Sequence, residues 1–296
     1  MSIGTLDDET VEKYRKAGEV LRTVLDEGAE LIEPGVTHLE VAEHTEERIR
    51  ELADGCAFPT NISVDEEASH ATPGRDDDTE FGEEMVCLDC GVHVDGYIAD
   101  AAVTVDLSGN DELVEAAEEA LDAAIDAIGP GVETSAVGAE IEDVIRGYGY
   151  NPVLNLSGHG VAQWDAHTGP SIPNRGSERG VELEVGDVVA VEPFATDGRG
   201  KVSEGAKEEI YSLENERSVR NRQARQILET VTEEYRTLPF AARWFDSPRA
   251  DMSIRRLTQQ NVLHGYPVLK EDEGTLVSQA EHTVVVTEDG CEILTD

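Results

Sequence analysis

Two aspartates, Asp89 and Asp100, lie in short apolar segments that the sequence predicts to be the strands of one hairpin. The Asp95-Gly96 pair between them is a strong signal for a two-residue turn. With that turn Asp89 pairs with Ala102, and Asp100 lies on the same face as Ala102 because side chains alternate along a strand. The two carboxylates are therefore expected to be diagonal neighbours that share a cation. A salt bridge is the alternative, but this hairpin carries no Arg or Lys.

A glycine-rich stretch supplies two histidines, His159 and His167. His159 lies between Gly158 and Gly160, which would leave its imidazole free to approach a metal ion. His167 could orient a substrate or stabilise developing negative charge. A lone histidine is usually structural, but a pair beside apolar strand sequence favours a functional site.

Two glutamates, Glu192 and Glu281, lie at the ends of apolar strand segments. Most acids in such an acidic chain are surface charges, so each glutamate alone is weak evidence. Together with the residues above they complete a set of four carboxylates and one imidazole: Asp89, Asp100, His159, Glu192 and Glu281. Hard oxygen donors with a single nitrogen suit two Mn, Fe or Co ions better than a thiolate zinc site.

Cys87 and Cys90 form an isolated C-x-x-C motif, which could indicate zinc or redox chemistry. No second cysteine pair or histidine cluster accompanies it, and a spacing of three along a strand places the two thiols on opposite faces. We therefore interpret both as small buried residues.

The elements that must position these residues form an internal repeat. A shift of 96 residues aligns the Pro-Gly-Val run 34–36 with 130–132, together with surrounding apolar positions. In both copies the pattern predicts a helix that ends at Pro-Gly and is followed by a second helix. In the first copy, this second helix begins with a capping box at Thr37 and Glu40. Chance agreement between amphipathic helices is the alternative. Two such halves facing each other would form a pseudo-twofold cleft.

Each helix pair precedes sequence of strand type. The predicted strands are 85–91, 97–105, 153–162, 188–193 and a late β-rich segment at 276–286. The chain is therefore expected to be an α/β protein.

Residues 206–268 differ in composition, with ten Lys and Arg against nine Asp and Glu. Helical patterns at 217–235 and 250–263 predict a helical insert. Four arginines could form a basic stripe on it: Arg217, Arg220, Arg222 and Arg225. The alternative is a solvated face paired with local glutamates, which we favour.

The whole chain is strongly acidic: 23 Lys and Arg against 64 Asp and Glu give a net charge of −41. This charge argues against DNA or an anionic membrane as partner. It suits a high-salt cytoplasm, where screening relieves self-repulsion. The first residues lack the pattern of a signal peptide, no segment is apolar enough to span a membrane, and four scattered cysteines are too few for a disulfide framework. We expect a soluble, cytoplasmic monomer.

These features resemble the type II methionine aminopeptidases of archaea and eukaryotes over essentially the whole chain. The motifs that carry the resemblance are Ala57-Phe58-Pro59-Thr60-Asn61, Ser69-His70-Ala71-Thr72-Pro73, Gly158-His159-Gly160, Gly169-Pro170-Ser171-Ile172-Pro173-Asn174, Glu192-Pro193-Phe194 and Gln279-Ala280-Glu281-His282-Thr283. The family implies the α/β "pita-bread" fold, with a catalytic domain at 1–205 plus 269–296 and an insert subdomain at 206–268 that is typical of type II.

The resemblance also implies a role for each ligand of two divalent cations, which would be Co, Mn, Fe or Zn. Asp100 and Glu281 would bridge both ions. His159 and Glu192 would hold one ion, and Asp89 would hold the other.

Four further residues match family positions around the substrate. His70 and His167 match the two active-site histidines, which would bind substrate and stabilise the tetrahedral oxyanion. Phe58 and Tyr266 match positions near the methionine side-chain pocket. Ala166 is a departure, because some relatives carry a larger apolar residue there.

The implied activity is hydrolytic removal of the N-terminal methionine from nascent proteins and peptides, with Glu192 as acid and base and a preference for small second residues. The ribosome is a further expected partner, through the insert. Two alternatives stay open: an Xaa-Pro aminopeptidase or prolidase, and a non-enzymatic binding protein of the same fold.

Overall fold

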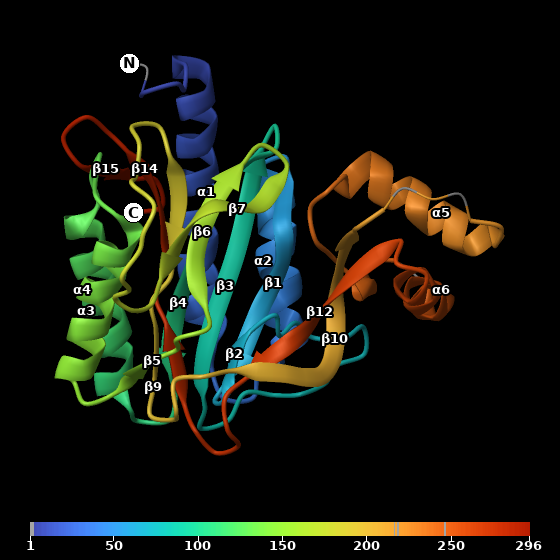
Figure 1. The fold of residues 1–296 in the computed structure, drawn as a ribbon. Coiled ribbons are helices and arrows are strands. Elements are labelled where there is room, and N and C mark those ends of the chain that lie inside the picture. Colours follow the sequence, from blue (N-terminus) through green and yellow to red (C-terminus); the bar gives the residue numbers. More distant parts are fainter. Residues whose placement is uncertain (1–2, 216, 218, 246) are drawn as a thin grey trace.

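Two halves, each with a helix pair packed on antiparallel strands, make up most of the molecule (Figure 1). The computed structural model describes residues 3–215, 217, 219–245 and 247–296. The first half contains α1 (Asp8–Leu31), α2 (His38–Leu52), β1 (Gly55–Val64), β2 (Glu67–Ser69), β3 (Met85–Val94) and β4 (Tyr97–Asp106). The second contains α3 (Asp111–Ala127), α4 (Thr134–Gly147), β5 (Asn151–Pro152), β6 (Ser157–Ala162), β7 (Asp165–Pro173), β8 (Val188–Val191), β9 (Phe194–Thr196), β13 (Val277–Gln279), β14 (His282–Val286) and β15 (Cys291–Ile293).

The helices end and begin near the Pro-Gly pairs and the capping box that the sequence predicts. In each half the first helix ends three residues before the Pro-Gly pair, and the glycine of that pair, Gly35 or Gly131, has a positive φ that favours glycine. Thr37 and Glu40 form the predicted capping box at the start of α2, satisfying two backbone N–H groups that the helix leaves free. The helix–turn–helix order of the repeat is therefore confirmed in both halves.

The sheets set the register of the acidic residues. β1, β3 and β4 form a three-stranded antiparallel sheet covered by α1 and α2, and Asp89 pairs with Ala102 as predicted. The larger sheet has the order β15-β14-β8-β6-β7. A short bridge joins the halves, because the Glu281 N–H donates to the Ala102 carbonyl at 3.0 Å.

One predicted strand, 153–162, is wrong in its first half. The strand β6 begins only at Ser157. The preceding loop is held instead by Asn155, whose side chain accepts from the Val202 N–H and donates to the Val202 carbonyl. Side chains of Asn and Asp commonly bond the backbone in this way and replace a ladder with a loop.

The insert combines helices with strands (Figure 1, orange). It contains α5 (Arg222–Thr230), a π-helical turn η1 (Val231–Tyr235), β11 (Phe240–Ala241), η2 (Ala242–Trp244) and α6 (Pro248–Gln259). These pack near β10 (Ser203–Leu213) and β12 (Leu263–Lys270), which lie in a sheet of order β11-β10-β12-β2. Both strands extend across the boundaries 206 and 268 of the predicted subdomain.

The two predicted insert helices were too long. α5 begins at Arg222 because Asn221 caps it, accepting from the Ala224 N–H at 3.0 Å. α6 ends at Gln259, and Leu263, predicted as helical, is the first residue of β12. Residues 216 and 218 of the predicted first helix lie outside the described residues.

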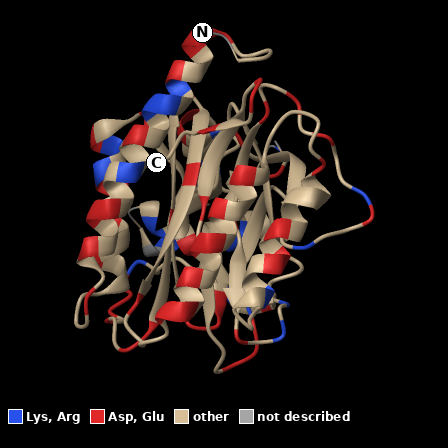
Figure 2. Ribbon diagram, turned by 90° about the vertical axis from the view of Figure 1, so that its left-hand side faces the viewer, with Lys and Arg blue, Asp and Glu red and all other residues tan. Residues whose placement is uncertain are grey.

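The described residues form five apolar clusters, of which the three largest lie under each helix pair and inside the insert. Most of the acidic residues are exposed or half-buried, and Figure 2 shows acidic residues along helices and loops of the side that carries α3 and α4. Among the described helices, none is long and apolar enough to cross a membrane.

Two hairpin tips meet at Trp164. Its backbone N–H donates to the Gly96 carbonyl at 2.8 Å, while Gln163 donates to the Asp95 carbonyl at 2.8 Å. The guanidinium of Arg236, from the insert, lies 4.0 Å from the centre of the Trp164 ring. Because β3–β4 carries Asp89 and Asp100 while β6–β7 carries both histidines, this joint fixes the two hairpins relative to each other.

We expect Gly96→Ala to weaken this joint. A Cβ there would lie 2.4 Å from the Trp164 ring, and Gly96 has φ +81°. The matched control is Gly109→Ala, with φ +82° and no heavy atom within 4 Å of the added carbon. Both variants pay a backbone cost of about 1 kcal/mol, and Gly96→Ala loses a further ~1–3 kcal/mol from overpacking. Equal loss of unfolding free energy in the two variants, from denaturant titrations, would contradict the steric role of Gly96.

Candidate metal centre

Asp89 of β3 and Asp100 of β4 point to the same side of their hairpin as predicted. Both side chains are buried, and the Oδ1 atom of each has no hydrogen-bond partner among the described residues. Neither forms an ion pair with Lys or Arg in the described part of the chain. The salt-bridge alternative is therefore wrong, and each buried carboxylate keeps an oxygen free to bind a cation.

His159 enters the site from β6, and its flanking glycines also serve the packing of the neighbouring strands. A Cβ on Gly158 would lie 2.3 Å from the Ala190 carbonyl oxygen, and one on Gly160 would lie 2.2 Å from that of Gly169. The glycines thus permit β8 and β7 to approach closely on either side of the histidine.

The His159 ring presents one nitrogen to the acids. Nδ1 lies 3.2 Å from the Gly160 carbonyl, so a proton on Nδ1 donates there and Nε2 carries the lone pair. Nε2 lies 3.8 Å from Asp100 Oδ2 and 3.3 Å from Glu192 Oε1. Burial lowers the pKa of His159 to about 3, aided by the neighbouring His167. The neutral imidazole is the form that ligates a metal.

Glu192 and Glu281 complete the cluster from the second half. Glu192 follows β8, and Glu281 lies between β13 and β14, next to the bridge with Ala102. Ligand atoms of Asp100, His159 and Glu281 all lie within 4.8 Å of one another. Sequence reasoning placed these residues together, and the structure brings them to one point.

The carboxylates raise one another's pKa values. Burial, followed by the charges of neighbouring carboxylates, holds the pKa of Asp100, Glu192 and Glu281 well above the ordinary range. Burial raises the pKa of Asp89 to about 7, against a hydrogen bond from Gln279. A bound divalent cation would offset both the cost of burying these negative charges and their mutual repulsion. The free Asp oxygens and the oxygen-rich donor set with one neutral imidazole therefore fit hard divalent metal ions.

The metal cluster forms one wall of a cavity of about 240 Å³. All nine residues predicted for the site line it: Phe58, His70, Asp89, Asp100, His159, His167, Glu192, Tyr266 and Glu281. The structure therefore brings together every predicted residue; the individual roles stay predictions.

His70 and His167 both line this cavity. His70 has φ +63°, a conformation that most side chains avoid, and its Nδ1 lies 3.3 Å from the Pro267 carbonyl. Its ring packs edge-on against Tyr266, and the His167 ring lies 4.4 Å from that of His159. Burial lowers the pKa of His70 to about 4 and lowers that of His167, so both rings are neutral near pH 7.

The Phe58 ring packs against a glycine on the adjacent strand. A Cβ on Gly91 would lie 2.3 Å from the Phe58 ring, so only glycine leaves room for the ring in its observed place. Phe58 and Tyr266 provide apolar surface to the cavity, together with two residues that sequence reasoning missed, Ile210 and Leu269.

Sequence reasoning also missed polar residues at the site. Thr283 donates to the Asp100 carbonyl at 2.7 Å and accepts from the Asp100 N–H at 2.8 Å, and Gln279 donates to Glu281 Oε2 at 2.9 Å. Their presence in the motif 279–283 was the available signal. Two further cavity residues, Asn61 and Ser69, lie in the motifs 57–61 and 69–73 but were given no role. Four others gave no signal in the sequence although they line the cavity: Asn155, Leu156, Ser157 and Pro239.

The C-x-x-C pair is structural, as interpreted. Cys87 donates to the Val277 carbonyl, whereas Cys90 contacts the Thr60 hydroxyl at 3.6 Å, and both thiols are buried and unbridged. Burial raises the pKa of Cys87 to about 11, which keeps it a protonated thiol.

With the fold and the cluster described, comparison with known proteins defines the class. Residues 12–288 match metallopeptidase family M24. The chain is 52% identical to a methionine aminopeptidase of Archaeoglobus fulgidus over 291 residues, covering 98% of this chain and 100% of the relative. Against the methionine aminopeptidase of Methanocaldococcus jannaschii it is 46% identical over 293 residues, covering 98% and 100%. The chain therefore belongs to metallopeptidase family M24.

Within that family, its full-length relatives confirm the resemblance to the archaeal, type II methionine aminopeptidases. Solved structures confirm the pita-bread fold. A methionine aminopeptidase from Thermotoga maritima matches with a TM-score of 0.73 at 25% identity, covering 99% of both chains. A thermophilic Arx1 matches with a TM-score of 0.86 at 19% identity, covering 98% of this chain and 91% of the other, and shares the fold alone.

Metal binding is expected to stabilise the protein measurably. At a Mn²⁺ concentration about 100 times the Kd, linkage adds about 2.7 kcal/mol, which raises Tm by roughly 5–10 °C for a chain of this size. Asp100→Asn should lose most of this shift, whereas the exposed control Asp122→Asn should keep it. Because protons compete for carboxylates of raised pKa, the shift should shrink as pH falls from 8 to 6. An undiminished shift in Asp100→Asn, by calorimetry, would remove Asp100 from the ligand set.

Proposed function

We propose that this chain removes the N-terminal methionine from peptides and nascent proteins by hydrolysis, with two divalent cations held by Asp89, Asp100, His159, Glu192 and Glu281. The observation that carries the proposal is the buried cluster of four carboxylates and a neutral imidazole in an M24 chain. Full-length identity of 52% to a methionine aminopeptidase supports the substrate class. The donor set accepts Co, Mn, Fe or Zn.

When bound, the cations supply Lewis acidity that lowers the pKa of water and polarises the scissile carbonyl. The chain's own part is proton handling. Glu192 has one side toward the cavity and a raised pKa from burial and from Asp100, so its carboxylate readily accepts a proton. It would return that proton to the leaving amine, since one group acts first as base and then as acid.

Two histidines and an apolar surface would hold the substrate. Near neutral pH, His70 and His167 are uncharged, so each can donate an N–H to a peptide carbonyl or to the developing oxyanion. Phe58 and Tyr266 would contact the methionine side chain. The preference for small second residues is carried by the family resemblance.

A prolidase-like activity is the rival within the fold. The prolidase of Pyrococcus furiosus shares the fold with a TM-score of 0.64 at 19% identity, covering 98% of this chain and 64% of the other. Cleavage of Met-Ala-Ser with no cleavage of Ala-Pro-Ser supports the proposal, and the reverse would support the rival. The complete ligand set argues against a non-enzymatic binding protein.

Replacing Glu192 by Gln tests the proton-transfer role. The amide keeps the side-chain shape but cannot accept the proton, so we expect kcat for Met-Ala-Ser to fall about 10²–10⁴-fold. Metal content, measured on the same sample, separates lost proton transfer from lost metal. Glu184→Gln, an exposed control, should keep the wild-type rate. A near-normal rate in metal-loaded Glu192→Gln would refute the role.

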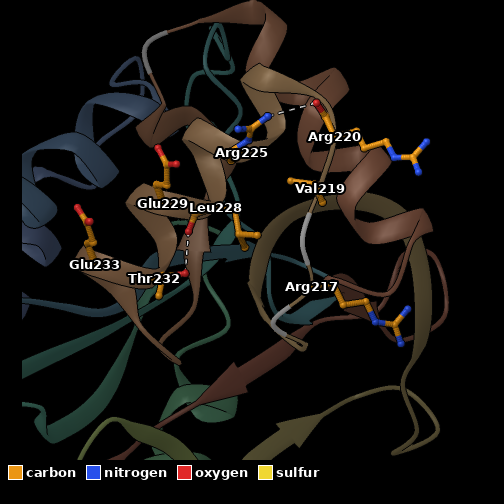
Figure 3. A pocket seen from close by; sticks show the side chains of 8 residues that line it. All are labelled: Arg217, Val219, Arg220, Arg225, Leu228, Glu229, Thr232 and Glu233. Atoms are coloured by element: carbon orange, nitrogen blue, oxygen red, sulfur yellow. Dashed lines mark hydrogen bonds between the residues drawn. The ribbon is translucent and has the colours of Figure 1, made fainter.

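The insert is the proposed contact with the ribosome. Arg217, Arg220 and Arg225 line a cavity of about 1030 Å³ on it (Figure 3). Glu229 of α5 and Glu233 of η1 line the same cavity. Among the described residues none of these arginines pairs with a carboxylate; Arg217 donates to the Gln260 carbonyl and Arg225 to that of Arg220. Arginines without a carboxylate partner among the described residues, on an insert with more basic than acidic residues, favour an anionic partner such as ribosomal RNA.

Charge neutralisation tests this contact. Changing Arg217, Arg220, Arg222 and Arg225 to Gln should reduce co-sedimentation with ribosomes several-fold at low salt, because phosphate contacts are electrostatic. The control changes four exposed bases elsewhere to Gln: Lys16, Arg22, Arg146 and Arg199. Equal co-sedimentation of wild type and the insert variant would remove the support. The two-part division of the chain (1–205 plus 269–296, and 206–268), the cytoplasmic location, the high-salt habitat and the monomeric state stay predictions.

A further inference from the structure

A buried ion pair joins the insert to α2 of the first half. Arg243 of η2 pairs through Nη2 with Glu46 Oε1 of α2, and the two side chains are only 4% and 2% exposed. Trp244 donates from its indole nitrogen to the other Glu46 oxygen at 2.6 Å. Arg50 lies 3.6 Å from this second Glu46 oxygen, but its side chain is half exposed, so Arg243 is the buried counter-charge of Glu46. Removing Arg243 would leave the buried carboxylate with only this outer partner, which is costly.

The pair closes a ring of hydrogen bonds through two wall segments of the site. Glu46 Oε1 accepts from the Thr60 N–H at 3.2 Å. Arg243 Nη1 donates to the Thr72 hydroxyl at 2.8 Å and to the Pro73 carbonyl at 3.0 Å. Thr72 in turn donates to the Thr60 carbonyl at 2.7 Å. The ring therefore holds β1 and the 70–73 loop in one fixed arrangement.

Both segments carry residues of the cavity. Thr60 lies between Phe58 and Asn61 in β1, and Thr72 is two residues from His70. The strained φ of His70 needs support from its surroundings, because such conformations persist only where the neighbouring structure determines them. Arg243 itself does not line the cavity.

We propose that the Glu46–Arg243 pair is a clamp, in which Arg243 is a positioning residue that sets where Phe58 and His70 meet the substrate. This inference rests on the proposed function, since it assigns the methionine-binding wall to those residues. It gives the insert a role in substrate binding, through contacts that reach none of the metal ligands directly.

The clamp needs arginine rather than a positive charge alone. Nη1 and Nη2 point to different partners at once, the Thr72–Pro73 segment and Glu46. Lysine offers one nitrogen at the end of a flexible chain and cannot span both partners in the same geometry. Burial also shields the pair from salt, which screens exposed pairs strongly and buried ones much less.

Arg243→Lys tests the clamp against Arg48→Lys, a control on α2 whose arginine pairs with Glu27 and Glu51 on the outside of the molecule. For Arg243→Lys we expect KM for Met-Ala-Ser to rise about tenfold, with kcat and the Mn²⁺ affinity from calorimetric titration within about twofold. Hydrogen exchange at the Thr60 and Ile62 amides, which donate to Glu46 and to the Ala71 carbonyl, should accelerate. The control should change none of these.

Glu46→Gln, which keeps the shape of the acceptor, provides a second variant if Arg243→Lys does not fold; it should raise KM and amide exchange in the same direction. The proposal is overturned if the folded variants keep the wild-type KM. A lower kcat with an unchanged KM, as expected if a smaller fraction of the molecules is active, would overturn it too. A wild-type chain that fails to cleave Met-Ala-Ser would instead refute the proposed function, and amide exchange would then decide the clamp by itself.

Discussion

Four carboxylates enclosed with one imidazole repel one another, and the rest of the structure depends on keeping them together. Burial first, and then the charges of the neighbouring carboxylates, raise the pKa values of Asp100, Glu192 and Glu281, so ionising the cluster costs free energy. The cost is opposed by burial of the apolar cores beneath both helix pairs. A bound cation would offset this cost, because the same charges that repel one another attract the ion.

The division of the ligands between two halves couples this centre to the fold. Asp89 and Asp100 come from the first half, whereas His159, Glu192 and Glu281 come from the second. The halves meet at the Ala102–Glu281 bridge and at the Trp164 joint. A site built across a joint exists only when both sides have folded, so metal affinity and folding stability are linked quantities.

The features of the fold and site that could be predicted from the sequence are those set by residues close together in the chain. The Asp89–Ala102 register was predictable because a two-residue turn fixes pairing locally. The purpose of Gly158 was not, because it depends on which strand lies beside β6. Glu46 and Arg243 gave no signal at all: they are distant in sequence, and an acid on a helix reads as surface charge. The ends of the insert helices were misjudged because an Asn cap and a following strand, rather than periodicity, set them.

The acids of this chain form two populations that respond to different physics. Most face solvent, where molar salt shortens the Debye length to about 3 Å and suppresses their mutual repulsion. The four at the centre are largely buried in the wall of the cavity, where salt screens their repulsion much less. A cation inside the cavity can relieve that repulsion, just as the buried guanidinium of Arg243, together with the more exposed Arg50, neutralises Glu46. An acidic surface suited to salt therefore leaves the need for specific internal positive charge unchanged.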